Sequence, residues 1–187
     1  MDGHLNKREY TVETIPLAMG VALVSQHHYS RGASNTAVYR HGLFRIDAPL
    51  ECLGVALWLP PTRPAALSVS PDWKRVLSLT RLVIVPGMPT NAASFLLGKS
   101  MGLIRKEGRF QTLLTYADEG QGHTGAIYRA TNWQYLGAMK GHPVWLNPDG
   151  RQMATKATTN RTYAEMQALG YERGPATRKH KFVMHLR

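Results

Sequence analysis

The sequence predicts one α/β (α+β) domain over residues 1–187, in which a mixed central sheet carries helices on both faces. Two strand-like segments near the N-terminus are typical of a hairpin, and strand-like and helix-like segments alternate after them. The 187 residues, 43% of them hydrophobic, suffice for one buried core. No internal repeat or domain boundary is visible.

The N-terminal segment predicts a strand followed by a helix. Residues 10–15 are rich in β-branched side chains, which favour a strand. The predicted helix runs from Pro16 to about His27, since proline suits the first helical turn. Its apolar residues at helical spacing are Leu17, Val21 and Val24. Residues 32–35 are then expected to form a loop.

The next segment predicts the hairpin. Residues 37–46 and 50–59 are both strand-like and are separated by a turn at Asp47-Ala-Pro. The second strand is almost continuously apolar, which predicts burial on both of its faces. Cys52 lies in this run and is expected to be a small core residue. Residues 60–71 are rich in proline and predict a loop.

The strongest strand signal in the chain is the segment 76–85, which ends at Pro86-Gly87. Thr90 or Asn91 is then expected to cap a helix that runs to about Arg105. The remaining predicted elements are strands at 110–116, 133–139, 144–146 and 181–186, a loop at 120–125, and helices at 126–130 and 162–169. The predicted order is β-α-β-β-β-α-β-α-β with a final strand.

The net positive charge of the chain indicates which class of partner it binds. The formal net charge is +11 and the isoelectric point is about 10.1, so polyanions are attracted and nucleic acid is the expected partner. The basic C-terminal part, residues 151–187, holds eight Lys and Arg against two Glu. We expect Arg178, Lys179 and Lys181 to bind phosphates. The alternatives are a solvated tail and a basic surface with no nucleic-acid partner.

The sequence disfavours a secreted, disulfide-bonded protein and a membrane protein. A single cysteine excludes an intrachain disulfide and suits a reducing compartment. No apolar run approaches the roughly 20 residues of a membrane span. The polar N-terminus lacks the apolar core of a signal peptide. The sequence therefore predicts a soluble cytoplasmic protein with no membrane partner.

Several polar residues stand where ligands commonly bind. Asp118 follows a predicted strand and could serve as a general base, although a turn-initiating aspartate is the alternative. Arg81 is a charge inside an apolar strand and needs a partner, either a ligand or a carboxylate such as Asp118. The helix start at residues 90–94 offers backbone N–H groups to an anion, or is ordinary capping. Tyr128 could be a packing residue or a proton donor.

Two long motifs carry a resemblance to a known family: LTRLVIVPGMPTNAASFLLGKS at 79–100 and YADEGQGHTGAIYRATNWQYLG at 116–137. Shorter matches are HHY at 27–29 and KHKFV at 179–183. On these residues the chain resembles the Mom family of DNA adenine-modification enzymes, from about residue 10 to its end. That family is similar to the GNAT acyltransferases, so the resemblance implies a GNAT-like fold. It also implies transfer of a carbamoylmethyl group to adenine N6, which protects phage DNA from host restriction.

The resemblance also implies roles for particular residues. Asp118 would receive or orient the N6 amine proton, and Tyr128 would protonate the leaving group. Arg81 would bind the donor or the substrate backbone. His28 and Tyr29 would contact an adenine turned out of the duplex. The residues implied in donor binding at the helix start are Asn91 and Ser94.

The donor and the rival functions stay open at this stage. GNAT proteins usually hold coenzyme A on a Gly-x-Gly loop, whereas residues 86–94 contain Gly87 alone. An acyl-coenzyme A and an aminoacyl-tRNA such as glycyl-tRNA are both chemically conceivable donors. No metal is expected, because His27, His28, His123 and Asp118 lack ligand spacing. A homodimer is left open. The rival functions are an acetyltransferase acting on a protein or small-molecule amine, and a non-enzymatic nucleic-acid-binding protein.

Overall fold

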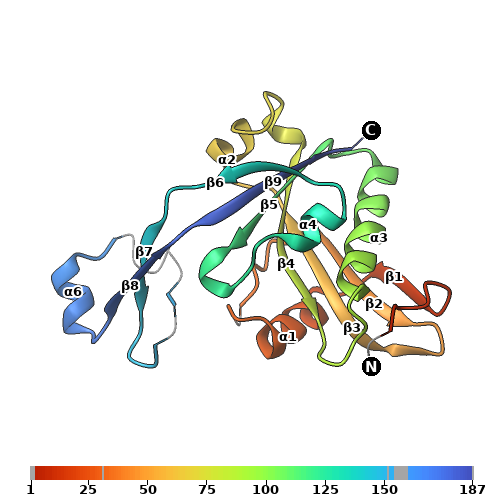
Figure 1. The fold of residues 1–187 in the computed structure, drawn as a ribbon, viewed down its shortest axis with the longest axis horizontal. Coiled ribbons are helices and arrows are strands. Elements are labelled where there is room, and N and C mark those ends of the chain that lie inside the picture. Colours follow the sequence, from red (N-terminus) through yellow and green to blue (C-terminus); the bar gives the residue numbers. More distant parts are fainter. Residues whose placement is uncertain (1–2, 31, 151, 154–159, 187) are drawn as a thin grey trace.

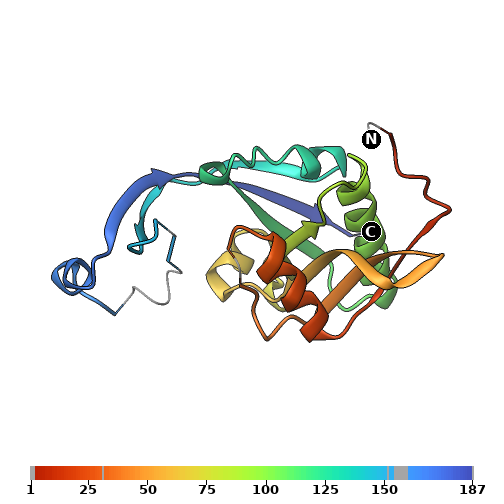
Figure 2. The same ribbon diagram turned by 90° about the horizontal axis from the view of Figure 1, so that it is seen from below.

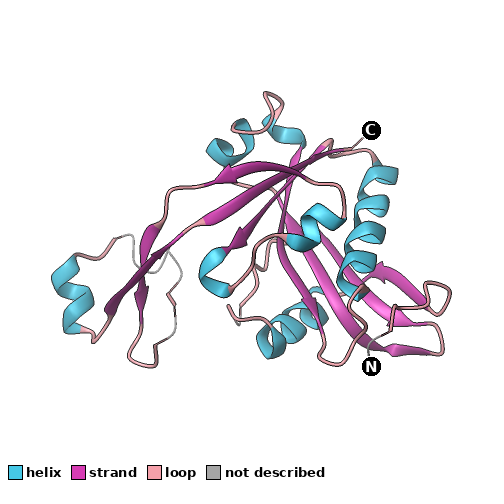
Figure 3. Cartoon of the chain, viewed as in Figure 1, coloured by secondary structure: helices cyan, strands magenta, loops and turns pink. Residues whose placement is uncertain are grey.

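A computed structural model describes residues 3–30, 32–150, 152–153 and 160–186. Its centre is a seven-stranded mixed sheet (Figures 1 and 3), in which only the pair β4 and β5 is parallel. The strands in spatial order are β1 (Tyr10–Thr14), β2 (Tyr39–Arg45), β3 (Ala48–Leu59), β4 (Val76–Ile84), β5 (Thr112–Asp118), β9 (Lys179–His185) and β6 (Gln134–Ala138).

Helices cover both faces of this sheet. On β3, Val55 and Leu57 pack in the cluster that contains Val24 of α1 (Leu17–His27), whereas Ala56 and Trp58 pack in the cluster around α3 (Ala92–Glu107). Successive strand residues face opposite sides, so α1 and α3 lie on opposite faces. The short helix α2 (Arg63–Leu67) lies on the same face as α1, and the short helix α4 (Ala126–Ala130) lies on the same face as α3, as Figure 2 shows. The predicted mixed sheet and its two-sided cover are confirmed.

A buried polar network links the sheet to α3. The Trp58 indole donates to the Ser100 hydroxyl oxygen at 2.8 Å, and that oxygen lies 2.6 Å from His41 Nδ1. The serine oxygen accepts from the indole and keeps its own hydrogen, so it can donate to His41 Nδ1 when the ring is neutral. Burial lowers the pKa of His41 to about 4.

The sheet splits between its two parallel strands. β4 and β5 pair only from Val76 opposite Thr112 to Ser78 opposite Leu114. Both strands continue beyond this point without pairing to each other, β4 to Ile84 and β5 to Asp118. A gap therefore opens in the middle of the sheet at the carboxyl ends of the two strands.

A β-bulge lies in β4 at the edge of this gap. Leu57 pairs with Arg81 but its neighbour Trp58 pairs with Leu79, which leaves Thr80 as the extra residue. The bulge reverses the alternation of side chains along the strand. Leu79 before it and Leu82 after it both pack in the cluster around α3. Arg81 is thereby placed on the α1 face.

A two-stranded ribbon extends from the sheet. The pairing of β6 with β9 reaches Ala138 opposite His180, and that of β7 (His142–Leu146) with β8 (Glu172–Thr177) begins at His142 opposite Thr177. The ribbon projects beyond the end of β5 and carries α6 (Tyr163–Ala168) at its far end (Figures 1 and 2). A capping box between Thr162 and Glu165 begins α6.

Some predicted boundaries were wrong. The predicted loop 60–71 contains α2, which has Pro64 in its first turn, and a 3-10 turn, η1 (Trp73–Arg75), follows it. The predicted loop 120–125 begins inside another such turn, η2 (Glu119–Gln121). β8 was not predicted. The strand predicted at 110–116 lies at 112–118, so Asp118 is its last residue rather than the residue beyond it.

Other sequence predictions are not settled by this fold. That residues 1–187 form one domain remains a prediction. Arg151, Lys156 and Arg187 of the basic C-terminal part lie outside the described residues. Within the described ranges, no helix has the length and apolar character needed to cross a membrane.

Candidate active site

A cavity of about 410 Å³ lies where β4 and β5 separate. Its walls come from both strands, the loop after α1, the first turn of α3, and the segment from Gly122 through α4. Sheet openings at the carboxyl ends of parallel strands are common ligand sites. Five predicted site residues line the cavity: His28, Tyr29, Arg81, Asp118 and Tyr128.

The cavity passes from one face of the sheet to the other. Leu114 and Tyr116 of β5 belong to the cluster beneath α2, whereas Ala117 belongs to the cluster around α3. By alternation Asp118 lies on the α1/α2 face, as Arg81 does. Tyr128 enters from α4 on the opposite face. The gap between the strands allows side chains from both faces to reach the same space.

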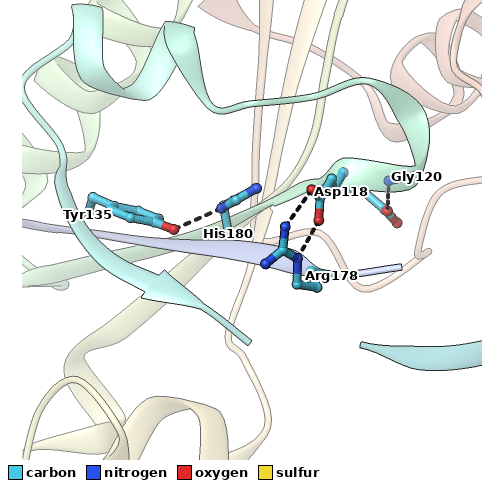
Figure 4. Close-up of polar contacts among 6 residues, drawn as sticks. Asp118, Gly120, Tyr135, Arg178 and His180 are labelled. Atoms are coloured by element: carbon cyan, nitrogen blue, oxygen red, sulfur yellow. Dashed lines mark hydrogen bonds and ion pairs between the residues drawn. The ribbon is translucent and has the colours of Figure 1, made fainter. Parts of the chain in front are cut away.

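Asp118 is a buried carboxylate, with 6% of its surface exposed. Its Oδ1 accepts from the Gly120 N–H at 3.0 Å, which caps η2 (Figure 4). Its Oδ2 lies 3.9 Å from Lys179 Nζ, on the residue directly opposite in β9. The carboxylate therefore has one hydrogen bond and one nearby positive charge, and it still borders the cavity.

Arg81 is held by main-chain carbonyls. Its Nε donates to Gly32 O at 2.7 Å and its Nη1 donates to Thr80 O at 2.6 Å. Across the described ranges no carboxylate lies within ion-pair distance of Arg81, so the pairing with Asp118 considered from the sequence is not observed. Burial lowers the pKa of Arg81. A partly buried guanidinium at a cavity wall is suited to binding an anionic or carbonyl oxygen.

His28, Tyr29 and His123 form an aromatic wall. The ring centroids of His28 and Tyr29 are 4.2 Å apart, and those of Tyr29 and His123 are 5.9 Å apart. Burial is the main cause that lowers the pKa of His28 to about 4, and the charges of Arg81 and His123 lower it further. His28 Nδ1 accepts from the Ser30 N–H at 3.1 Å, so the neutral ring carries its proton on Nε2.

His123 lines the cavity, although the sequence did not indicate it as a substrate-binding or catalytic residue. The sequence offers it only as a possible metal ligand, and its spacing from the other histidines does not support that role. The available signal was its place in the glycine-rich segment GQGHTG, next to a predicted short helix. The structure brings this segment against the loop after α1, which no local pattern indicates.

Tyr128 is fixed by aromatic packing. Its ring centroid lies 5.7 Å from that of Trp133 and 5.1 Å from that of Phe182. Burial raises the pKa of Tyr128, and a side-chain hydrogen bond with Thr115 opposes this shift. A tyrosine with a raised pKa stays protonated at neutral pH, which a proton donor requires. Gly125, with φ of 78°, lets the start of α4 approach the Phe182 ring.

The two predicted donor-binding residues at the start of α3 do not line the cavity. Asn91 Oδ1 accepts from the Leu5 N–H at 2.7 Å, and Ser94 Oγ donates to Asn91 O at 2.9 Å. Ala93 is the residue of this turn that borders the cavity. The Asn91 side chain therefore fastens the N-terminal segment to the helix start, and it does not cap the helix.

The three predicted phosphate-binding cations lie where the ribbon joins the sheet. Arg178, which Figure 4 labels, donates from Nε and Nη2 to the carboxylate oxygens of the unlabelled Glu119 at 2.8 and 2.9 Å. Lys179 faces Asp118. Lys181 donates to Ser68 Oγ at 2.5 Å. Each cation thus has a partner within the chain, and the charge of Lys181 is not neutralised by its partner.

In the part of the chain that the structure describes, no group of three or more His, Cys, Asp or Glu side chains could hold a metal ion. His27, which was considered with His28 and His123, does not line the cavity.

Comparison with known sequences identifies a family and a relative. Residues 9–186 match the Mom protein family. The methylcarbamoylase Mom of Escherichia phage Mu is 26% identical over 135 residues, which cover 70% of this chain and 55% of that protein. The matched part thus spans about half the length of the relative.

Comparison with solved structures identifies GNAT acetyltransferases. The IAA acetyltransferase of Bacillus cereus is similar with a TM-score of 0.58 at 12% identity, covering 95% of this chain and 99% of that one. A GNAT family acetyltransferase of Elizabethkingia anophelis, solved with acetyl-CoA bound, has a TM-score of 0.55 at 12% identity and the same coverage of 95% and 99%. At such low identity these matches show the fold, which is GNAT-like.

Proposed function

The chain belongs to the Mom protein family, and from this premise we propose that it modifies adenine in DNA, converting N6 to a carbamoylmethyl adduct that protects the DNA from restriction. The observation that carries the proposal is the cavity through the sheet. Asp118 and Arg81 reach it from one face and Tyr128 reaches it from the other. An acyl transfer needs a base, an acid and an oxygen-binding group around one carbon.

In the proposed reaction the adenine N6 amine attacks the carbonyl carbon of an acyl donor. The new bond is N6–C, and the bond that breaks joins the carbonyl carbon to the oxygen or sulfur of the leaving group. Asp118 accepts the proton lost by N6, and the Tyr128 hydroxyl gives its proton to the leaving atom. Arg81 binds the donor or a phosphate of the substrate.

A glycyl ester would lead to the adduct without any other reactant. Acyl transfer first gives an N6-glycyl amide, which is an isomer of the carbamoylmethyl product. Attack of the glycyl amine on C6 of adenine, with release of the amide nitrogen from C6, exchanges the two nitrogens and gives the final linkage. The two carbons and the oxygen of the added group, and the nitrogen now bonded to C6, then come from glycine. The original N6 becomes the carbamoyl nitrogen, and no electrons are lost or gained.

The start of α3 favours an aminoacyl ester over coenzyme A as the donor. Residues 86–94 contain one glycine, and the side chains of Asn91 and Ser94 contact main-chain groups outside the cavity. These residues do not form the Gly-x-Gly loop that holds coenzyme A in GNAT proteins. A glycyl-tRNA is the donor that also supplies the atoms of the adduct. Cells fed ¹⁵N-glycine should yield modified adenine that carries one more ¹⁵N than the unmodified adenine of the same DNA, whose N7 also derives from glycine. Equal ¹⁵N content in the two bases would exclude this donor.

Nucleoside mass spectrometry on plasmid DNA from expressing cells tests the function. We expect an adenine species heavier by a carbamoylmethyl group with the wild-type protein. Asp118→Asn should abolish it, since the amide keeps the shape but cannot take the proton. The matched control is Glu119→Gln, which changes the neighbouring exposed carboxylate and should keep most of the activity. Unmodified DNA from folded wild-type protein would contradict the proposal and favour an amine acetyltransferase.

A further inference from the structure

Several cations on the surface have no carboxylate partner. The described residues contain three ion pairs, Arg45–Asp47, Arg178–Glu119 and Lys179–Asp118. Arg63, Lys74 and Arg109 are exposed and belong to none of them. Grouped cations without counter-charges repel one another, so a nearby polyanion would stabilise them.

These cations are connected to the candidate site by a chain of contacts. Lys179 and Lys181 are two residues apart on β9 and therefore point to the same face of the sheet. Lys181 donates to Ser68, the residue that ends α2. Arg63, at the first position of α2, therefore lies on the same side as the two lysines, and the positive charge continues along this face.

The chain of contacts continues to the far end of the sheet. The Arg63 guanidinium lies 5.3 Å from the ring centroid of Trp73, and Lys74 Nζ lies 5.8 Å from it. The next residue, Arg75, donates to Gly108 O at 2.7 Å and to Arg109 O at 3.3 Å. Arg75 thus joins η1 to the turn after α3 that carries Arg109, whose guanidinium lies 5.1 Å from the Phe110 ring centroid and ends the series at the edge of the α3 side. We call Lys179, Lys181, Arg63, Lys74 and Arg109 the basic track.

The basic track starts beside the cavity on the face from which Asp118 and Tyr29 line it. Its far end lies near the start of β5, where Gln111 N–H donates to Arg75 O. β5 runs from Thr112 to Asp118, which is roughly 20 Å at about 3.3 Å per residue. B-form DNA advances about 3.4 Å per base pair. The track therefore has the length of about six base pairs.

We propose that the basic track binds the phosphate backbone of duplex DNA on one side of the adenine held in the cavity. This inference rests on the proposed function and adds the path of the DNA to it. Charge complementarity favours a polyanion, and continuity with the Asp118 side of the cavity favours the nucleic acid that bears the target base. The opposite face, with α3 and α4, is left for the acyl donor.

Salt-dependent binding to a duplex tests the proposal. The test variant is Arg63→Gln/Lys74→Gln/Arg109→Gln, and the matched control is Lys7→Gln/Arg8→Gln/Lys99→Gln, which removes the same charge from exposed positions outside the track. Fluorescence anisotropy with a 30-base-pair duplex gives log K against log salt concentration. Each lost phosphate contact lowers the slope by about 0.9. We expect the slope of log K against log salt concentration to be smaller in magnitude by about 2 to 3 for the test variant, and by less than about 1 for the control.

Two results would overturn the proposal: equal slopes for the test and control variants, or tighter wild-type binding to a single-stranded RNA of equal length than to the duplex. The binding assay is independent of catalysis, and nucleoside mass spectrometry is run on the same proteins. Modified adenine with unaltered slopes would refute the track alone. A lowered slope for the test variant without any modified adenine would refute the proposed reaction and leave the track supported.

Discussion

Asp118 and Tyr128 reach the cavity from opposite faces of β5, and their surroundings suit opposite halves of a proton transfer. Asp118 has the Gly120 N–H and the Lys179 ammonium beside it, and both groups stabilise a carboxylate. Tyr128 lies between the rings of Trp133 and Phe182, where burial raises its pKa. The raised pKa keeps the Tyr128 hydroxyl protonated at neutral pH, as a proton donor requires.

Tyr128→Phe separates the acid role from packing. The phenylalanine keeps the ring contacts and removes only the hydroxyl, so the fold should be retained while modification slows by about 100-fold or more. Single-turnover rates of adenine modification, together with thermal unfolding, measure both effects. Tyr135→Phe is the control, because it removes the hydroxyl that lies 2.9 Å from His180 Nδ1 outside the cavity. Equal rates for the two variants would exclude Tyr128 as the proton donor.

His41 makes stability depend on pH. Its pKa of about 4 in the folded protein is below the ordinary value of 6.5, so the unfolded chain binds more protons in between. The contribution of His41 to the free energy of unfolding is fully present above pH 6.5. It is lost as the pH drops towards 4, by up to about 3 kcal/mol. His41→Asn keeps an acceptor for Ser100 and does not titrate. Urea unfolding gives the decrease in the free energy of unfolding from pH 7.5 to pH 5, and this decrease should be smaller by about 2 kcal/mol in the variant than in the wild type. Equal decreases in the two proteins would refute this role of His41.

Arg81 shows which part of the site the sequence could not reveal. An arginine within LTRLVIV indicates a buried charge that needs a partner, and this is correct. The partners are the Gly32 and Thr80 carbonyls, because the bulge at Thr80 turns the side chain towards α1. A bulge leaves no periodic pattern in the sequence, so the partner could not be predicted.

At the scale of elements, local signals explain the successes and the failures. The helix at 126–130 was predicted with the bounds it has, since a glycine-rich segment precedes a short apolar run. β8 was missed because its sequence, ERGPAT, contains glycine and proline, which disfavour strands. Pairing with β7 along the ribbon overrides that preference. Such long-range pairing cannot be read from a local window.

Gly125→Ala should displace α4 and with it Tyr128. Both Gly125 and Gly122 have positive φ, 78° and 70°, so an alanine at either position costs about 1 kcal/mol of backbone strain. Only at Gly125 would the added Cβ collide with the Phe182 ring; at Gly122 nothing lies within 4 Å. Gly122→Ala is thus a matched control. Gly125→Ala should lower the melting temperature further and reduce the modification rate; equal shifts would contradict the close approach.

At the scale of the molecule, the two faces of the sheet carry different parts of the site. The mixed sheet and its helices on both faces were predictable from the order of the elements. The split between β4 and β5 was not, because it depends on where pairing stops rather than on which residues form strands. Lys179, Lys181 and Arg63 of the basic track share a face with Asp118. The first turn of α3 borders the cavity from the other face.

Substitutions on the two faces should therefore have separable effects. Ala93→Leu narrows the α3 side of the cavity and should raise the KM for the donor by about 10-fold at unchanged DNA affinity. Tyr29→Ala removes a half-exposed ring from the opposite side and should weaken binding of DNA with an unpaired adenine, since stacking on a base contributes about 1–3 kcal/mol. Equal changes in both constants for either variant would mean that the reactants share one entrance.

The opening through the sheet also bears on the order in which the two reactants bind during turnover. Two reactants that enter the cavity from opposite faces of the sheet do not obstruct each other, so either can bind first. Both are then bound when the acyl group is transferred. The sole cysteine, Cys52, donates to Gly54 O at 3.4 Å and does not line the cavity, so it cannot carry the group between half-reactions. Initial rates should give intersecting double-reciprocal lines, the signature of a ternary complex, and parallel lines would reveal a ping-pong cycle through a covalent intermediate.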